Sequence, residues 1–282
     1  MHNIALSWRQ AAVLTVALAV MYLWLRVAAS SMARKVAPFA REACVIAGLY
    51  SLWQLAGELS VTGTAGAIGR AEWIERVEHD LWLPTESSVQ HLLTDHPLLT
   101  QGANLYYASM HFGALFVFLI WLFVRHRPSY PPVRTTLALT TLVCLLIQLV
   151  PVAPPRLLSG YVDTAAQYGQ SVYSLGFGAD ELSAMPSVHV AWAVLIAWYA
   201  ARLSSSRWRW IGAAHAVLTV LVVVSTANHW WLDGIVAVLV LATCAWARAA
   251  AAVLVRRFID PREPAPVHVP ARREGALPDP QR

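Results

Sequence analysis

The chain has 282 residues, of which 57% are hydrophobic and only 13% are charged. Because a typical soluble domain carries roughly 25% charged residues, this composition excludes an ordinary water-soluble globular protein. The net charge of +5 comes from basic residues that are spread over several loops and the tail. This dispersal argues against a nucleic-acid partner.

Seven apolar blocks follow one another along the chain, and a bilayer-spanning helix needs about 20 apolar residues. Six blocks approach that length, and the block at 188–201 is short. We therefore expect an all-α fold, a polytopic membrane helix bundle with six or seven transmembrane helices. The first block could instead be a secretory signal, but its apolar stretch is long for that role. The blocks cover residues 11–29, 43–61, 104–124, 135–152, 188–201, 211–227 and 230–246.

The charges of the loops alternate along the chain. The first, third and fifth loops and the tail are basic, whereas the second and fourth loops are acidic. Since Lys and Arg stay on the cytoplasmic side, we expect a multi-pass protein of the cell membrane with its N-terminus outside and its C-terminus in the cytoplasm.

The second loop contains a helical pattern. Ile74, Val77 and Leu81 recur at helical spacing, with acidic residues between them. This pattern predicts an amphipathic helix on the outer membrane surface, or equally a helix packed over the spans. We expect N-terminal transmembrane helices over 1–62 and a membrane domain over 63–255 that includes this helix. A disordered cytoplasmic tail, rich in Pro, Arg and Glu, is expected over 256–282.

Two short segments place polar residues at the ends of apolar blocks, where they are costly inside a membrane. Residues 184–189 read Ala-Met-Pro-Ser-Val-His, and residues 226–233 read Thr-Ala-Asn-His-Trp-Trp-Leu-Asp. The orientation above puts both segments at the outer membrane face, together with Arg156. The fourth loop is long for a connection between helices, so we expect it to line or cover a site.

The two segments carry residue types suited to group transfer. His229 and Asp233 are four residues apart and would share one face of a helix that begins by Asn228. The carboxylate can then accept the proton of one imidazole nitrogen, which leaves the other nitrogen as a nucleophile. His189 opens the facing span and can protonate a leaving oxygen as a general acid.

A phosphate site is expected beside these groups. Pro186 suits the first turn of a helix, so the N–H groups of Ser187, Val188 and His189 would point outward as an anion site. Arg156 adds a forked donor that matches phosphate oxygens. The whole set predicts a phosphoryl-transfer site.

Two other readings of these residues stay open. The histidines and Asp233 could be structural, bonded to neighbouring helices as we expect for His215 and His111. Two histidines and a carboxylate could also bind iron or zinc. Against a metal, the HExxH spacing is absent and Arg156 would repel a cation.

In their order and spacing, these motifs resemble the type 2 phosphatidic acid phosphatase superfamily, and more closely its branch related to inositol phosphorylceramide synthase. The similarity runs over roughly residues 69–237 and includes Glu78, the segment 104–107 with His111, and the segment 154–156. It implies a metal-independent, two-step mechanism without a cofactor. By this resemblance His229 forms a phosphohistidine, Asp233 orients it, His189 is acid and then base, and Arg156 binds phosphate.

The chain departs from the superfamily at two positions. Leu149 and Val223 stand where the superfamily has a phosphate-binding Lys and Arg. Thr226 and Asn228 are candidates for neutral phosphate donors in their place, beside Ser187.

The functional expectation is an integral membrane lipid-phosphate phosphatase or phosphotransferase acting on a lipid phosphate or phospholipid. With a polar alcohol such as inositol as the acceptor, it would be a phospho-headgroup transferase. The non-enzymatic alternative is a lipid carrier or scramblase.

Overall fold

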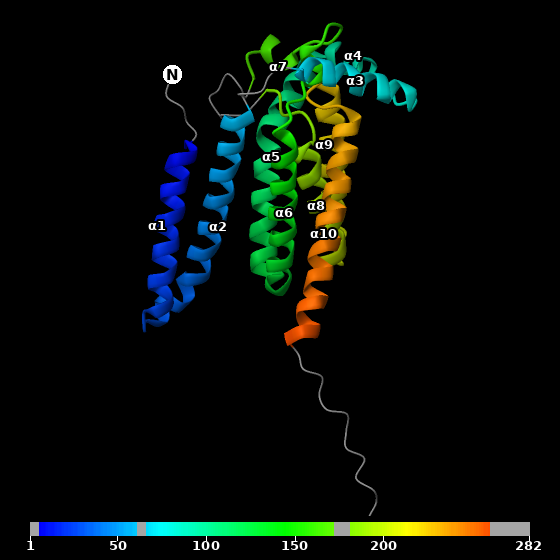
Figure 1. The fold of residues 1–282 in the computed structure, drawn as a ribbon. Coiled ribbons are helices and arrows are strands. Elements are labelled where there is room, and N and C mark those ends of the chain that lie inside the picture. The colour runs from blue at the N-terminus through cyan, green and yellow to red at the C-terminus, as the bar shows by residue number, and fades with distance from the viewer. Residues whose placement is uncertain (1–5, 61–65, 172–180, 260–282) are drawn as a thin grey trace, which may run out of the picture.

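The computed structural model describes residues 6–60, 66–171 and 181–259. Within these residues the regular elements are helices, apart from one isolated β-bridge between Val152 and Ser183. Long helices stand side by side, and short helices gather across one end of the bundle (Figure 1). We call this end, which carries α3, α4 and α7, the capped end. The predicted all-α fold is confirmed.

Each long helix overlaps one apolar block of the sequence, but α2 begins before its block and α10 ends after its block. The long helices are α1 (Trp8–Val27), α2 (Ser31–Ser60), α5 (Pro97–Arg125), α6 (Tyr130–Gln148), α8 (Val188–Leu203), α9 (Arg209–Ser225) and α10 (Trp231–Ile259). The short ones are α3 (Ala67–Asp80), α4 (Glu86–Thr94) and α7 (Thr164–Gln167), with 3-10 turns at Arg127–Ser129 and Pro155–Leu157.

Four helical stretches are long and apolar enough to cross a membrane: Trp8–Val27, Pro97–Arg125, Arg127–Gln148 and Trp231–Arg256. The helices α8 and α9 are apolar but have only 16 and 17 residues. The expectation of six or seven spans therefore stays a prediction, whereas several membrane-compatible helices are present.

The core of the bundle is an apolar cluster between α5, α6 and α8. Leu122, Val133 and Leu195 in this cluster are fully buried. The helices α8 and α9 approach closely at Gly212, where an added Cβ would lie 3.2 Å from the Cα of Ala197. Small residues at such a crossing let helix backbones approach each other. This packing fixes the helix that leads into the turn carrying His229.

The helix α3 buries one face and exposes the other. Ala67, Ala71, Ile74 and Glu78 recur at helical spacing on its buried face. Trp73 on the other face, and Trp82 just after the helix, are exposed. The helix therefore packs over the capped end of the bundle, which is one of the two arrangements expected from the sequence. A contact of its exposed face with a membrane stays a prediction.

The first residues of the predicted tail are helical. The helix α10 continues to Ile259, so residues 256–259 are helical. The remainder of the predicted tail, 260–282, lies outside the described residues, as does the predicted domain boundary at 62–63.

Candidate active site

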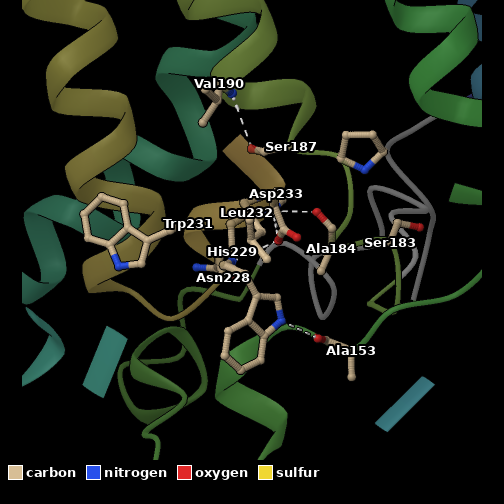
Figure 2. Close-up of polar contacts among 12 residues, drawn as sticks. Ala153, Ser183, Ala184, Ser187, Val190, Asn228, His229, Trp231, Leu232 and Asp233 are labelled. Atoms are coloured by element: carbon tan, nitrogen blue, oxygen red, sulfur yellow. Dashed lines mark hydrogen bonds and ion pairs between the residues drawn. The ribbon is translucent and has the colours of Figure 1, made fainter. Parts of the chain in front are cut away.

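The two polar segments of the sequence meet at the capped end, where α8 and α10 begin (Figure 2). His229 is buried in the turn that joins α9 to α10. Its Nδ1 lies 2.8 Å from the carbonyl oxygen of Ala184 and 3.2 Å from Oδ2 of Asp233. Its Nε2 is buried and has no hydrogen-bond partner among the described residues.

These contacts determine where the imidazole carries its proton. A carbonyl oxygen and a carboxylate oxygen only accept hydrogen bonds, so Nδ1 of His229 must be the donor. In the neutral ring, the lone pair then lies on Nε2. The nitrogen without a partner is therefore the one that can act as a nucleophile.

The helix start differs from the expectation. The helix α10 begins at Trp231, so His229 precedes the helix and does not lie on its face. Asp233 sits at the third position of the helix, and its Oδ2 also accepts the N–H of Trp230 at 2.9 Å. A carboxylate at this position commonly bonds back to the N–H of the residue before the helix. The same bond that caps the N-terminus of α10 therefore brings the Asp233 carboxylate next to His229.

His189 lies next to His229 in a cluster of rings. The centroids of the two imidazole rings are 5.5 Å apart. On its other sides His189 stacks on Tyr107 at 4.4 Å and contacts His111 at 4.0 Å, while His111 stacks on Trp192 at 4.2 Å. Ring contacts of this kind restrict the orientation of an imidazole. Residues of α5 and α8 therefore fix His189 beside the nucleophile candidate.

Arg156 belongs to the fourth loop and is buried against the turn that carries His229. Its Nε donates to Oδ1 of Asn228 at 3.1 Å, and its backbone N–H donates to the carbonyl of Ala227 at 2.9 Å. Its Nη1 donates to Asp163 at 2.9 Å and to Glu181 at 3.0 Å. Sequence reasoning missed these two carboxylates as partners, because loop residues seven and 25 positions away carry no spacing signal.

Asn228 and Thr226 lie behind Arg156. The Asn228 amide donates to the Thr226 hydroxyl at 2.8 Å, and that hydroxyl donates to the carbonyl of Val222 at 2.7 Å. The chain of bonds holds the guanidinium in place. Between them, Ala227 adopts a left-handed backbone with φ of 54°, a conformation that a residue with a Cβ rarely takes. A direct phosphate contact by Thr226 would require exchange of its present bond, so that role stays a prediction.

The expected anion site at the start of α8 is only partly present. Pro186 does not stand in the first turn, because the helix begins at Val188 and Ser187 caps it by accepting the N–H of Val190. The Ser187 N–H donates to the carbonyl of Asp233 at 3.1 Å, so it does not point outward unpaired. The expectation for this N–H group was wrong, because the tertiary contact to α10 uses it.

The positions of the two missing cations are apolar. Leu149 is partly exposed at the end of α6, and Val223 is buried against α8 and α10. Among the described residues, no group of three or more His, Cys, Asp or Glu side chains is arranged to hold a metal ion.

A sequence model described as the PAP2 superfamily matches residues 72–247, which is more than half of the chain. The chain belongs to this superfamily. Its members are generally phosphoric-ester hydrolases or phosphotransferases, so membership indicates chemistry of this kind. No curated protein and no solved structure matches the chain. The matched segment contains His189, His229, Asp233 and Arg156, and it excludes α1 and α2.

Proposed function

We propose that this protein is an integral membrane enzyme that removes a phosphoryl group or phospho-headgroup from a lipid through a phosphohistidine on His229. The observation that carries the proposal is the asymmetry of the His229 ring. Its Nδ1 faces two acceptors, and its buried Nε2 has no partner among the described residues. A nitrogen with a free lone pair beside an acid candidate is the arrangement that nucleophilic catalysis requires.

In the first step, the Nε2 lone pair attacks phosphorus while the bond from phosphorus to the leaving oxygen breaks. His189 donates its proton to that oxygen. The ring of His229 becomes positively charged as the phosphorus–nitrogen bond forms. Asp233, in contact with Nδ1, stabilises that charge.

In the second step, His189 takes a proton from the acceptor hydroxyl, and the acceptor oxygen attacks phosphorus. The phosphorus–nitrogen bond breaks, and its electron pair returns to Nε2. Water as the acceptor makes the protein a lipid-phosphate phosphatase, and an alcohol makes it a transferase. Arg156 holds the phosphate oxygens in both steps, and the chain's own residues carry the mechanism without a metal.

The surroundings of Arg156 favour the transferase as the second candidate. The single positive charge of Arg156 is paired with the carboxylates of Asp163 and Glu181. The apolar residues Leu149 and Val223 add no positive charge at their positions. A monoester phosphate carries close to two negative charges, whereas a diester carries one. The diester therefore meets less repulsion from the two carboxylates. This balance favours a phospholipid donor whose headgroup passes to a polar alcohol such as inositol.

Product analysis of the purified protein tests both candidates. Phosphatidic acid, a polyprenyl diphosphate and a phosphodiester phospholipid are each incubated with and without inositol, and His229→Gln is run in parallel. Released orthophosphate supports the phosphatase, and a new headgroup ester supports the transferase. A protein that moves lipid between leaflets equally well with or without His229, and forms no product, would be a carrier or scramblase.

We further propose that the capped end faces outward from the cell, since the basic loops lie at the opposite end of the helices. Ser159 and Ser205 are exposed residues near opposite ends of the bundle. A membrane-impermeant thiol reagent should label Ser159→Cys and leave Ser205→Cys unlabelled in intact cells. Serine positions suit this test, because Gly160 and Gly169 have positive φ angles that disfavour a cysteine. The reverse labelling would place the site in the cytoplasm.

A further inference from the structure

The start of α10 is held by three carboxyl groups from three different parts of the chain. Asp233 accepts the N–H of Trp230, as described above. Oε1 of Glu86 accepts the next N–H, that of Trp231, at 3.2 Å. Oε1 of Glu78 accepts the following one, that of Leu232, at 2.7 Å. The first N–H groups of a helix have no partner within the helix, so these side chains satisfy them.

Glu78 and Glu86 belong to α3 and α4, the two short helices that cross the capped end. Both side chains are buried, with 3% and 2% of their surfaces exposed. A third contact ties α10 to the segment between α3 and α4, because Nε1 of Trp231 donates to the carbonyl of Pro84 at 2.7 Å. Acidic residues are rarely buried unless they are paired, so the burial of both glutamates needs a structural or functional explanation.

We infer that Glu78 and Glu86 are positioning residues that fix the first turn of α10 and thereby hold Asp233 against His229. The inference rests on the proposed role of His229 as the nucleophile. Neither residue touches the reacting atoms in this account. Each acts through the backbone of α10, on which Asp233 stands one residue after Leu232.

The two carboxyl groups can lie together only if they do not both carry a charge. Burial, followed by the neighbouring Glu86 and Asp233 carboxyl groups, raises the pKa of Glu78 to about 9. At neutral pH, Glu78 is then protonated, and its Oε1 still accepts the Leu232 N–H. Protonation removes the repulsion that a charged Glu78 would feel from nearby carboxylates.

The other titratable groups around Glu78 come from the loop and from α3 itself. Tyr161 donates to Glu75 at 3.0 Å. The outer pocket that both glutamates line also includes Arg76, His79 and Asp80. None of these replaces the acceptor that Leu232 needs. Ionisation of Glu78 as the pH rises through about 9 would place a second negative charge beside Glu86. Repulsion should then move the two carboxylates apart, and the first turn of α10 should become less stable.

Glu78→Gln and Glu78→Ala separate this role from simple packing. Glutamine resembles the protonated acid, because its oxygen can accept the Leu232 N–H and the side chain carries no charge. We expect Glu78→Ala to lower kcat by about 100-fold with little change in KM, which is the cost of a small misplacement of catalytic groups. Glu78→Gln should keep activity within about threefold of wild type at neutral pH and should lose the fall in activity above about pH 9.

Asp80→Asn is the matched control, since the Asp80 side chain is 83% exposed on the same helix. It should retain both the activity and the fall at alkaline pH. Equal losses in the Gln and Ala variants would overturn the inference, and so would an unchanged alkaline fall in Glu78→Gln.

Hydrogen exchange of a peptide covering residues 226–235 gives a second measurement that does not depend on any reaction. Exchange of the Trp231 and Leu232 amides should accelerate in Glu78→Ala and stay slow in Glu78→Gln at neutral pH. Unchanged exchange in both variants would refute the positioning role even if the protein proves inactive on every lipid. Conversely, if the protein proves inactive but exchange is faster in Glu78→Ala and not in Glu78→Gln, the positioning role is supported and only the proposed function fails.

Discussion

The N-terminal hairpin and the bundle that follows it are both helical, but they are held together differently. The helices α1 and α2 stand beside each other at the edge of the molecule and pack through small and apolar residues (Figure 1). An ion pair of the buried Glu42 with the partly exposed Arg134 links the hairpin to α6. The capped end of the bundle instead buries His229, Asp233, Arg156 and two glutamates, and each of them is hydrogen-bonded.

This difference separates the part of the chain that holds the proposed active site from the part that contributes no residue to it. Buried polar groups cost free energy unless they are hydrogen-bonded, so they accumulate where a function needs them. The superfamily match begins at residue 72, and it leaves out the hairpin. Substitutions at the capped end should therefore affect turnover, and substitutions in the hairpin should affect stability alone.

The largest effect is expected for His229→Gln. Glutamine has no nucleophilic nitrogen, so kcat should fall by about 10,000-fold or more while the protein stays folded in detergent. His79→Gln is the control, because the His79 side chain is 82% exposed on α3. Near-normal turnover in His229→Gln would contradict the proposal that the capped end carries the catalytic residues.

Asp233→Asn should have the next largest effect, about 100- to 10,000-fold in kcat. Oδ2 of Asp233 contacts both the Trp230 N–H and Nδ1 of His229, so an asparagine oxygen in its place can keep both contacts. The variant then lacks the negative charge that stabilises the positively charged ring of the phosphohistidine. Steady-state kinetics measures this loss, and full activity in Asp233→Asn would contradict this role.

Arg156→Lys should lower kcat by about 100-fold, since it removes a preorganised donor while keeping the charge. Lysine cannot bond to Asn228 and to the two acidic residues from one planar group. Steady-state kinetics with the donor identified by product analysis measures this loss. Retained activity would mean that any positive charge at this position is sufficient.

Glu42→Gln should leave kcat within about twofold of wild type and destabilise the protein by about 2 kcal/mol, because it weakens a charged hydrogen bond. The Glu42 side chain is 8% exposed, and Arg134 contacts both of its oxygens at 2.6 Å. Thermal unfolding in detergent and an activity assay on the same sample test the two parts. A large loss of kcat without a loss of stability would show that the hairpin contributes to the site.

The smallest effect is expected from chelation. Activity should persist in excess chelator, because Arg156 supplies the positive charge that a metal would otherwise provide. Loss of activity that one divalent metal restores would instead favour the two-histidine, one-carboxylate metal site.

Local sequence patterns predicted the parts of this site that depend on neighbouring residues. The approach of His229 and Asp233 followed from their spacing of four, although the helix starts after His229 and the contact arises from closure of the helix start. The apolar blocks likewise predicted the helices, because their periodicity and length are local properties. Even so, the exact start of α8 was misplaced, since Ser187 and not Pro186 determines where that helix begins.

The remaining features depend on contacts between distant segments. Glu86 lies 145 residues from the N–H that it accepts, and Glu78 lies 154 residues from its own partner. Glu78 follows Ile74 by four residues and therefore shares its face of α3, but this spacing does not indicate which distant N–H group its carboxyl group accepts. The pairing of Arg156 with Asp163 and Glu181 likewise follows from the path of the fourth loop.

The central claim is that phosphorus bonds to His229, and trapping that intermediate tests it most directly. His189→Ala removes the group proposed to activate the second acceptor, so a phosphoenzyme formed from a phosphate-labelled lipid should accumulate. After a rapid alkaline quench, mass spectrometry should find acid-labile phosphate, or the labelled phospho-headgroup, on the peptide that contains His229, and His229→Gln should carry none. Label on another residue, or product formation with no labelled enzyme under any quench, would contradict the account.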